Sequence, residues 1–352
     1  MSALKIHGPT PHLTGTISVS GSKNATLPLL TASLLVPGSH ILRNAPNIID
    51  VQNLLLILSH LGSKVKRRGG NLRLDTPHVI ADGGVVVVPR ELAVTGTANL
   101  LLAACSASGI TTLHNAAREP EISDLANCLV GMGAFIEGAG SETIRIRGRM
   151  ALKLYRYRVM GDWIECGMWM IVGALVGGSL AVKGCAVACL GTVVEKLRAV
   201  GARIEVAGED AITVYKAPHL RATDTQTGPY PSFPTDLQAP LTALLCLASG
   251  VSTITETLYE HRFAHVAELR RMGADITVSG GSRESTVAVV RGVERLKGAE
   301  VVARDLRAGA CLVVAGLVAE GETVVGEWEM IERGYDQLEG KVEGVGGRVS
   351  KQ

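Results

Sequence analysis

The feature that most constrains the fold is an internal repeat of about 70 residues. In each copy an apolar, helix-like run ends in glycine, and a short β-prone run and a polar loop follow. Successive glycines are 69 to 72 residues apart, and they are Gly38, Gly109, Gly178, Gly250 and Gly321. A residue just past a helix end commonly takes the left-handed conformation, which glycine adopts without steric cost. We therefore expect each glycine to close a helix.

A second series of glycines follows the first at intervals of 23 to 25 residues. It again ends helix-like runs and precedes alternating strands, and its members are Gly62, Gly133, Gly201, Gly273 and Gly346. The interval has room for one strand, one loop and one helix. The repeating unit is therefore predicted to be βαβα with closing strands, present five times.

Composition supports tightly connected α/β units. Of the 352 residues, 47% are hydrophobic and 19% are charged, which excludes a disordered chain. The chain has 41 glycines but only 3 Trp, 6 Tyr and 3 Phe, so its core must be aliphatic and its backbone must turn often. A formal charge of +2 gives no electrostatic reason to expect a nucleic-acid partner.

Cysteine usage and hydropathy predict a soluble protein of the cytoplasm. The seven cysteines are odd in number, form no CxxC pair and mostly lie in apolar runs, which is typical of a reduced compartment. The first residues contain no apolar signal-like run. The longest apolar stretch, 168–182, is shorter than the ~20 residues that a membrane helix needs.

Polar residues recur where the first helix of each repeat should begin. They stand 14 to 16 residues before the first glycine, and they are Lys23, Thr95, Asp162, Asp236 and Arg307. A second set of cations stands where the other helices should begin, and its members are Arg118, Arg262 and Arg333. Since helix N-termini expose unpaired N–H groups, these residues could form a cradle for phosphate or carboxylate.

A structural interpretation of the same residues stays open. Asp162, Asp236 and Asp305 are well placed to cap helices, and a single Lys or Arg is commonly a solvated or paired surface cation. His261 and His265 have the spacing of a helical metal pair, but a third ligand is missing, so we expect no metal site. The segment TGTAN lacks the lysine of a phosphate-binding P-loop.

Longer motifs carry a family resemblance over most of the chain. They are SGSKNATLPLLTASLL, NAAREPEISDLAN, FPTDLQAP, ITETLYEHRFAHVAELRRMGA, ARDLRAGACLVVAGLVAEGETVV and IERGYDQLEGKV. With them the sequence resembles the UDP-N-acetylglucosamine 1-carboxyvinyltransferases, the enolpyruvyl transferases that begin peptidoglycan precursor synthesis. The related enzymes of the shikimate pathway carry a different lysine motif at the start.

The resemblance implies an α/β fold known as an inside-out barrel, with two lobes of three βαβαββ units and an active site in the cleft between them. This chain has five units instead of six. We expect one lobe with two units at 23–159, and a second lobe with three units formed by 1–22 plus 160–352. The absent unit, the second in the family, would fall near residues 75–85.

The absent unit matters for chemistry, because in the family it carries a loop with the motif GGCxIGxRP. Its cysteine is the general acid, and its arginine helps to hold phosphoenolpyruvate. None of the seven cysteines here has a comparable context. Two smaller departures are Trp163, where the family has arginine, and His261, where it has asparagine.

By resemblance, the 3-hydroxyl of UDP-N-acetylglucosamine adds to C2 of phosphoenolpyruvate, C3 is protonated and phosphate leaves. No metal or organic cofactor is implied. Asp236 matches the base on the sugar hydroxyl, and Lys23 matches the lysine that binds phosphoenolpyruvate. The other matched substrate-binding positions are Asn24 for the sugar, Thr95 for the uridine-diphosphate loop, Arg333 for phosphoenolpyruvate, and Arg262, Asp305 and Arg307 in the cleft.

Loss of a whole unit removes a lid and an acid, so we expect weak or absent activity despite this ancestry. It is also expected to expose apolar surface, unless the shortened lobe closes differently or a partner covers it. Two alternatives to a working transferase are a non-catalytic binder of UDP-sugars and a deletion product that folds poorly.

Overall fold

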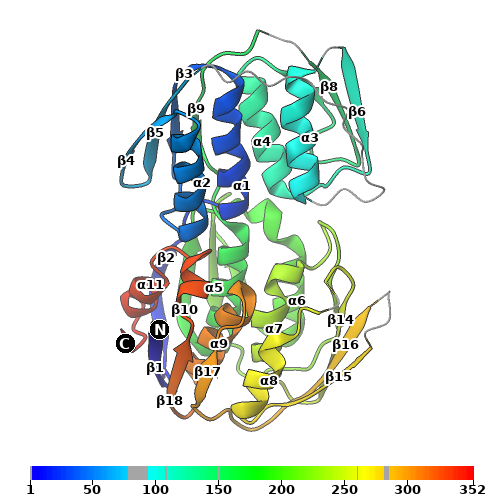
Figure 1. Ribbon diagram of the computed structural model, residues 1–352. Helices are drawn as coiled ribbons and strands as arrows, with labels where there is room; N and C mark the ends of the chain where they lie inside the picture. Colours follow the sequence, from blue (N-terminus) through cyan, green and yellow to red (C-terminus); the bar gives the residue numbers. More distant parts are fainter. Residues whose placement is uncertain (1, 78–93, 108, 149–150, 260, 281–284) are drawn as a thin grey trace. The chain divides into compact units, whose positions relative to one another are not determined.

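The computed structural model describes residues 2–77, 94–107, 109–148, 151–259, 261–280 and 285–352. The chain divides into two compact units (Figure 1). Unit 1 comprises Met1–Val19 and Asp162–Gln352, and unit 2 comprises Ser20–Gly161. These boundaries lie within a few residues of the expected lobes at 23–159 and 1–22 plus 160–352.

Three four-stranded sheets with one shared topology form the β-structure of unit 1. The strands are β1 (Ala3–Gly8), β2 (Leu13–Ser18), β10 (Gly177–Lys183), β11 (Arg203–Val206), β12 (Ala211–Tyr215), β13 (Thr225–Gln226), β14 (Val251–Glu256), β15 (Asp275–Gly280), β16 (Thr286–Arg291), β17 (Glu300–Val302), β18 (Gly321–Gly326) and β19 (Val349–Lys351). Their orders are β19–β1–β18–β17, β11–β12–β10–β2 and β15–β16–β14–β13. Each sheet has three antiparallel strands and a fourth, parallel strand at one edge.

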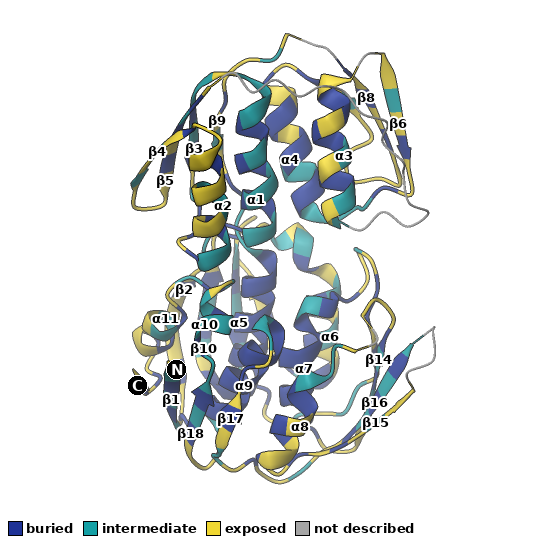
Figure 2. Ribbon diagram, viewed as in Figure 1, coloured by how far each residue is buried: buried dark blue, intermediate teal, exposed yellow. Residues whose placement is uncertain are grey.

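Three helices occupy the core of unit 1 and pack against one another: α5 (Trp163–Val176), α7 (Gln238–Leu245) and α9 (Leu306–Val318). Every residue of α5 and α7 is buried (Figure 2). A helix that is apolar on all sides is stable in water only when other elements surround it. The remaining helices are α6 (Gly191–Val200), α8 (Ala264–Arg271), α10 (Glu329–Glu332) and α11 (Leu338–Gly344).

The described residues of unit 2 form two sheets and four α-helices. Its strands are β3 (Gly38–Arg43), β4 (Lys64–Arg68), β5 (Asn71–Thr76), β6 (Ile110–His114), β7 (Phe135–Glu137), β8 (Thr143–Arg147) and β9 (Arg156–Arg158). The sheet β4–β5–β3–β9 repeats the topology of unit 1, whereas the described residues of the sheet β6–β8–β7 form three antiparallel strands. The helices are α1 (Lys23–Ala32), α2 (Ile49–His60), α3 (Val94–Ser106) and α4 (Pro120–Gly131).

The expected inside-out α/β barrel is found in part: the elements are those of an α/β fold, but the part of the chain that the structure describes forms no closed barrel. The strands there form separate open sheets of three or four strands, and each sheet keeps two edges. A closed barrel needs its first and last strands to pair, which these sheets do not do. Most of the junction near residues 75–85, where the absent unit is expected, lies outside the described residues.

The two glycine series adopt the predicted conformation at nine of ten positions. All five glycines of the second series have φ between 92° and 112°. Gly178 is the exception in the first series, because α5 runs directly into β10 without a left-handed residue. A Cβ on Gly178 would lie 2.8 Å from Oγ1 of Thr14 on the neighbouring strand. Glycine is needed there for close approach between strands, and not for a helix end.

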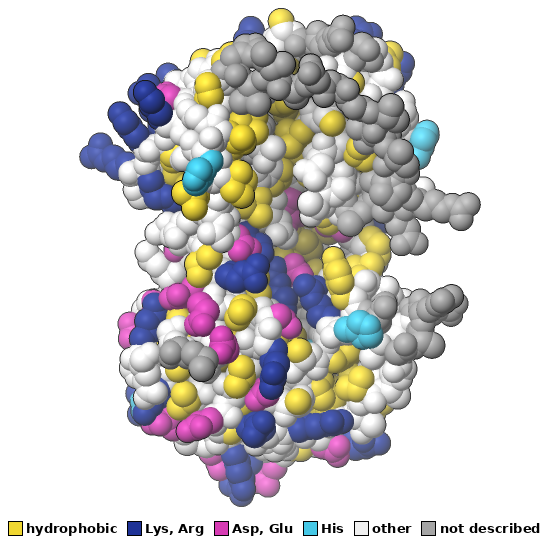
Figure 3. Space-filling model, viewed as in Figure 1, with side chains coloured by type: hydrophobic (Ala, Val, Ile, Leu, Met, Phe, Trp, Pro, Cys, Tyr) yellow, Lys and Arg dark blue, Asp and Glu magenta, His cyan; other side chains and the backbone are white. Residues whose placement is uncertain are grey.

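Helix α2 of unit 2 has large aliphatic side chains on its exposed face, whereas helix α6 of unit 1 has charged ones there. Leu56 and Ile57 of α2 are 58% and 55% exposed. In contrast, the exposed positions of α6 include Glu195 and Arg198. Figure 3 also shows Lys and Arg side chains gathered over the β4–β5 hairpin beside α2. The described residues of unit 2 thus leave apolar surface of α2 exposed.

Two further findings concern the cysteines and the hydropathy of the helices. All seven cysteines are free, and six of them are buried. Among the described residues, none of the helices combines the length and hydropathy that a membrane crossing requires.

Gly167 of α5 allows the segment before α7 to pack closely against α5. A Cβ on Gly167 would lie 2.3 Å from Cδ1 of Leu237, a side chain with no exposed surface. Leu237 ends the short 3-10 helix Thr235–Leu237, which also carries Asp236. The absence of a side chain at residue 167 therefore lets this segment pack against α5.

We predict that Gly167→Ala lowers the free energy of unfolding by about 1–3 kcal/mol, because the buried Leu237 has to move. The matched control is Gly340→Ala in α11, where a Cβ meets nothing within 4 Å. That change should be neutral or stabilise the fold by up to ~1 kcal/mol, since alanine favours helix more than glycine does. Urea denaturation measures both, and equal stabilities of the two variants would contradict the prediction.

Candidate functional site

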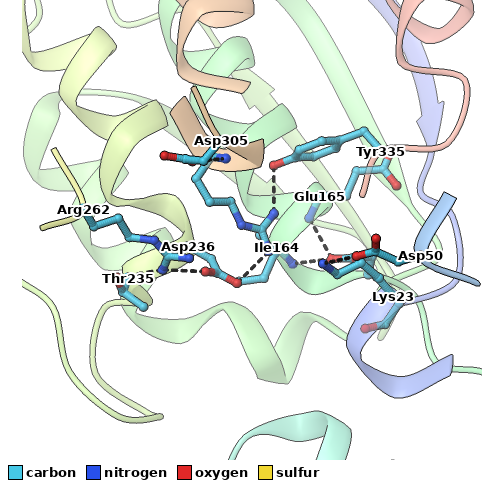
Figure 4. Close-up of polar contacts among 12 residues, drawn as sticks. Lys23, Asp50, Ile164, Glu165, Thr235, Asp236, Arg262, Asp305 and Tyr335 are labelled. Carbon is cyan, nitrogen blue, oxygen red and sulfur yellow. Dashed lines mark hydrogen bonds and ion pairs between the residues drawn. The ribbon is translucent and has the colours of Figure 1, made fainter. Parts of the chain in front are cut away.

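The densest polar cluster near a predicted site residue in unit 1 is centred on the carboxylate of Asp236 (Figure 4). Its Oδ1 lies 2.7 Å from Nη1 of Arg262, and its Oδ2 lies 2.6 Å from Nη2 of Arg307. Each carboxylate oxygen thus accepts from a different guanidinium. The fold thus brings Asp236 into contact with two arginines, of which Arg307 is 71 residues away in the sequence.

The segment Pro234–Leu237 positions Asp236 without using its side chain as a helix cap. Thr235 and Leu237 are buried, while the Asp236 side chain remains 20% exposed. The buried neighbours fix the backbone of Asp236, while its carboxylate remains accessible to solvent. Such a carboxylate can interact with a ligand.

Arg262 lies in the loop between β14 and α8 and is held from two directions. Its Nη1 donates to Oγ1 of Thr235 at 2.9 Å as well as to Asp236. Its guanidinium carbon lies 4.8 Å from the ring centroid of Tyr259. These contacts fix the guanidinium while its side chain stays 23% exposed.

Arg307, near the start of α9, is the more deeply buried of the two cations, with a side chain 9% exposed. Its Nη1 donates to Oη of Tyr335 at 3.2 Å. Asp305 caps the same helix and accepts from the backbone N of Arg307 and Ala308, both at 2.8 Å. Because Asp305 fixes the first turn of α9, it also fixes the position of the Arg307 side chain in that turn.

Electrostatics keep this cluster ionised. Burial raises the pKa of Asp236, but the guanidiniums of Arg307 and Arg262 outweigh that effect and lower it to about 2. Burial lowers the pKa of Arg307, and Asp236 more than reverses this, so the pKa is raised overall. Burial also raises the pKa of Tyr335 to about 12, partly opposed by Arg307. In this arrangement Asp236 is a weak base.

In unit 2, Lys23 is the first residue of α1, and its Nζ lies 3.2 Å from Oδ2 of Asp50. Both side chains are 18% exposed. Asn24 follows on the same helix and is half-buried, and Thr95 is exposed in the first turn of α3. Arg118 lies 3.6 Å from Glu142, a surface pair.

Arg333 is exposed just after α10, two residues before Tyr335. The predicted site residues of unit 1 thus fall into two groups. Asp236, Arg262 and Arg307 contact one another directly, and Asp305 supports Arg307 through the backbone. No described contact joins Arg333 to this set.

The capping interpretation is correct for two aspartates and wrong for the third. Asp162 accepts from the backbone N of Ile164 and Glu165, and Asp305 caps α9 in the same way. Asp236 makes no described capping bond and instead joins the two arginines. Position in the repeat could not separate them, because Arg307 comes from the next repeat and Arg262 from a later segment of the same repeat.

The two histidines have different surroundings, since His265 is buried and His261 is exposed. Burial lowers the pKa of His265 to about 4, partly opposed by Asp305. In the part of the chain that the structure describes, no group of three or more His, Cys, Asp or Glu is arranged to hold a metal ion.

Sequence reasoning missed four residues that contact predicted site residues or their neighbours: Asp50 beside Lys23 in unit 2, and Thr235, Glu256 and Tyr335 in unit 1. Thr235 and Tyr335 lie within or next to the quoted motifs FPTDLQAP and IERGYD, so proximity to a matched residue was the available signal. For Asp50, 27 residues from Lys23, the sequence offers no comparable signal.

Comparison with known families identifies the class. The chain matches the family model described as EPSP synthase (3-phosphoshikimate 1-carboxyvinyltransferase) over residues 8–79 and 83–342. The crystal structure of the enolpyruvyl transferase NikO from Streptomyces tendae has the same fold, with a TM-score of 0.87 at 23% identity over 100% of this chain and 99% of that one. EPSP synthase from Acinetobacter baumannii is more distant in fold, with a TM-score of 0.72 at 14% identity, over 100% of both chains.

Curated relatives narrow the class. A UDP-N-acetylglucosamine 1-carboxyvinyltransferase of Anaeromyxobacter sp. (strain K) is 38% identical over 426 positions, covering 100% of this chain and 99% of the relative. One of Nitratidesulfovibrio vulgaris (strain DP4) is 38% identical over 421 positions, covering 100% of both chains. The chain therefore belongs to the enolpyruvyl transferase family, among relatives named UDP-N-acetylglucosamine 1-carboxyvinyltransferase.

The same comparisons bear on chain length. The alignment with the Anaeromyxobacter relative spans 426 positions, 74 more than the 352 residues of this chain. The match to the family model is interrupted between residues 79 and 83. This interruption falls inside the range 75–85, where the sequence predicts that a unit is absent.

We predict that Asp236→Asn lowers the free energy of unfolding at pH 7 by about 2–3 kcal/mol, because two part-buried guanidiniums lose their counterion. The pKa of Asp236 is lowered from its ordinary 3.8 to about 2, so its stabilisation is present above about pH 4. That stabilisation is lost as pH falls toward 2. The parent and the variant should therefore converge between these pH values.

Urea denaturation at a series of pH values measures this convergence. Asp275→Asn is the control, since Asp275 faces Arg291 across 3.9 Å with both side chains more than half exposed. That variant should differ from the parent by less than ~0.5 kcal/mol. A pH-independent difference for Asp236→Asn would contradict the prediction.

Proposed function

We propose that this protein transfers the enolpyruvyl group of phosphoenolpyruvate to the 3-hydroxyl of UDP-N-acetylglucosamine, the first committed step of peptidoglycan precursor synthesis. The observation that carries the proposal is the Asp236 carboxylate between Arg262 and Arg307, which combines a proton acceptor with two anion-binding groups. Full-length relatives bearing this activity in their names support it.

In this proposal Asp236 is the base that removes the proton from the sugar hydroxyl. The hydroxyl oxygen then bonds to C2 of phosphoenolpyruvate while a proton adds to C3, which gives a tetrahedral ketal. The C2–O bond to phosphate then breaks and a proton leaves C3, which restores the C2=C3 double bond of the enolpyruvyl product. The chemistry needs cations for a phosphate and a carboxylate. Further substrate contacts are assigned to Lys23, Asn24, Thr95, Arg262, Asp305, Arg307 and Arg333.

Asp236 can act as a base only after its surroundings change, because two guanidiniums hold its pKa at about 2. A bound substrate anion competes for the guanidinium hydrogens. As Arg262 or Arg307 turns to that anion, Asp236 loses positive charge and its proton affinity rises. Binding of phosphoenolpyruvate would thereby prepare the base for the sugar hydroxyl.

Lys23 and Asp305 have supporting roles of different kinds. Lys23 brings a cation whose present partner is Asp50, at 3.2 Å, and a substrate phosphate could replace that partner. Asp305 is committed to capping α9 through two backbone bonds. Through these bonds Asp305 also fixes the start of the helix that carries Arg307, in addition to the substrate contact assigned to it.

A second candidate function is non-catalytic binding of UDP-N-acetylglucosamine. It is favoured by the 74 positions of the relative's alignment that exceed this chain, and by the interruption between residues 79 and 83. No cysteine has the GGCxIGxRP context, and burial raises the pKa of Cys105 to about 11 and that of Cys128 to about 12. These thiols are structural and do not replace a general acid.

We expect phosphate release by this chain to require both substrates and to be slow, since a general acid typically contributes 10²–10⁴-fold. A coupled phosphate assay at high enzyme concentration measures it, with Asp236→Asn as the inactive control. Phosphate release without UDP-N-acetylglucosamine, or undiminished release by Asp236→Asn, would contradict the transferase proposal.

A chain with one consensus unit inserted after residue 80 separates the two candidate functions. Rescue of turnover would indicate that the remaining site residues are competent. Saturable binding of UDP-N-acetylglucosamine by calorimetry, with no turnover in either chain, would favour the binder. A broad melt that neither substrate sharpens or shifts would instead indicate a product that folds poorly.

A further inference from the structure

Glu256, which the sequence did not single out, lies behind the Asp236 cluster and has no exposed surface. It is the last residue of β14. Its Oε1 accepts from Oγ1 of Thr227 at 2.8 Å and from the backbone N of Leu258 and Tyr259 at 2.9 and 3.1 Å. These three bonds hold the carboxyl group rigidly and leave Oε2 directed to a different partner.

That partner is Thr235, the neighbour of Asp236. Oγ1 of Thr235 donates to Oε2 of Glu256 at 2.8 Å and accepts from Nη1 of Arg262 at 2.9 Å. A threonine hydroxyl has one hydrogen. Since Glu256 takes that hydrogen, the lone pairs of Thr235 face Arg262, and the hydroxyl can act only as an acceptor toward the guanidinium.

We propose that Glu256 is a positioning residue for the candidate base, acting through the Thr235 hydroxyl to hold Arg262 against Asp236. The inference rests on the proposed function and deepens it, because it assigns how the resting geometry of that site is set. Neither Glu256 nor Thr235 needs to touch substrate. Their role is to set the position of the Arg262 guanidinium before and after a substrate anion binds.

The two hydrogen bonds that join Glu256 to Thr235 and Thr235 to Arg262 can be removed separately by substitution. Thr235→Val keeps the shape of the side chain but removes the hydroxyl, so Arg262 loses one of its two described hydrogen-bond acceptors. Thr235→Ser keeps the hydroxyl and should restore the link. Glu256→Gln places an amide where a carboxylate oxygen accepted, which reverses the direction of the Thr235 bond or breaks it.

Thr227→Val is the matched control. It also removes a hydroxyl bonded to Glu256, but on the Oε1 side, which two backbone N–H groups still hold. Thr227 has no described bond to Arg262. A loss caused only by weakening the packing around Glu256 would therefore affect Thr227→Val and Thr235→Val equally.

Two measurements on the full chain test the proposal. The first is the titration of the Asp236 carboxyl by ¹³C NMR, which does not need turnover. In Thr235→Val and Glu256→Gln the midpoint should rise by about half a pH unit or more, because Arg262 moves away from the carboxylate. In Thr235→Ser and Thr227→Val it should stay at the parent value.

The second measurement is phosphate release with both substrates, in the parent chain or in the chain with the inserted unit. Thr235→Val and Glu256→Gln should each lose about tenfold in kcat/KM, consistent with loss of a hydrogen bond to a charged group. The acidic limb of the pH profile should shift upward. The double variant should be no worse than either single variant, since both break one chain of bonds.

Unchanged Asp236 midpoints in Thr235→Val and Glu256→Gln would overturn the proposal, and so would equal shifts in Thr227→Val. These outcomes do not depend on whether the enzyme turns over. If neither chain releases phosphate, the transferase proposal fails, while the NMR titration still decides whether Glu256 positions Arg262.

Discussion

The arrangement of unit 1 depends on burying three helices on all sides. Every residue of α5 and α7 is buried, and α9 is nearly so. A polar side chain in the middle of such a helix would lose its hydration without compensation, so polar chemistry is confined to the ends. Asp162, Asp236 and Asp305 all stand just before or at a helix start. The site is located where the core permits charge.

Confinement at helix starts produces strong electrostatic coupling. Asp236 receives one guanidinium on each oxygen, and Arg307 donates onward to Tyr335. This pairing stabilises the fold and at the same time makes the carboxylate a poor base. The proposed chemistry therefore requires a competing anion, and the bonds between Asp236 and the two guanidiniums make the proposed reactivity dependent on substrate.

Much of the fold was predictable from the repeat, because glycine φ angles and apolar periodicity are local properties. The second glycine series is left-handed throughout, whereas Gly178 departs because its neighbour Thr14 comes from a strand more than 160 residues earlier. The α/β class was expected correctly, but the described strands form open sheets and no closed barrel, since periodicity predicts strands but not which of their edges pair.

By itself the sequence determined the family and the identity of the polar residues at helix starts, since these depend on motifs and spacing. It could not distinguish a capping aspartate from a site aspartate. Asp162 and Asp305 bond to backbone two or three residues away, whereas Asp236 bonds to Arg262 and Arg307, 26 and 71 residues away. The same holds for Glu256 and Thr235, which meet only because β14 ends beside the segment before α7. Long-range packing, and not local propensity, decided which carboxylate became the centre of the site.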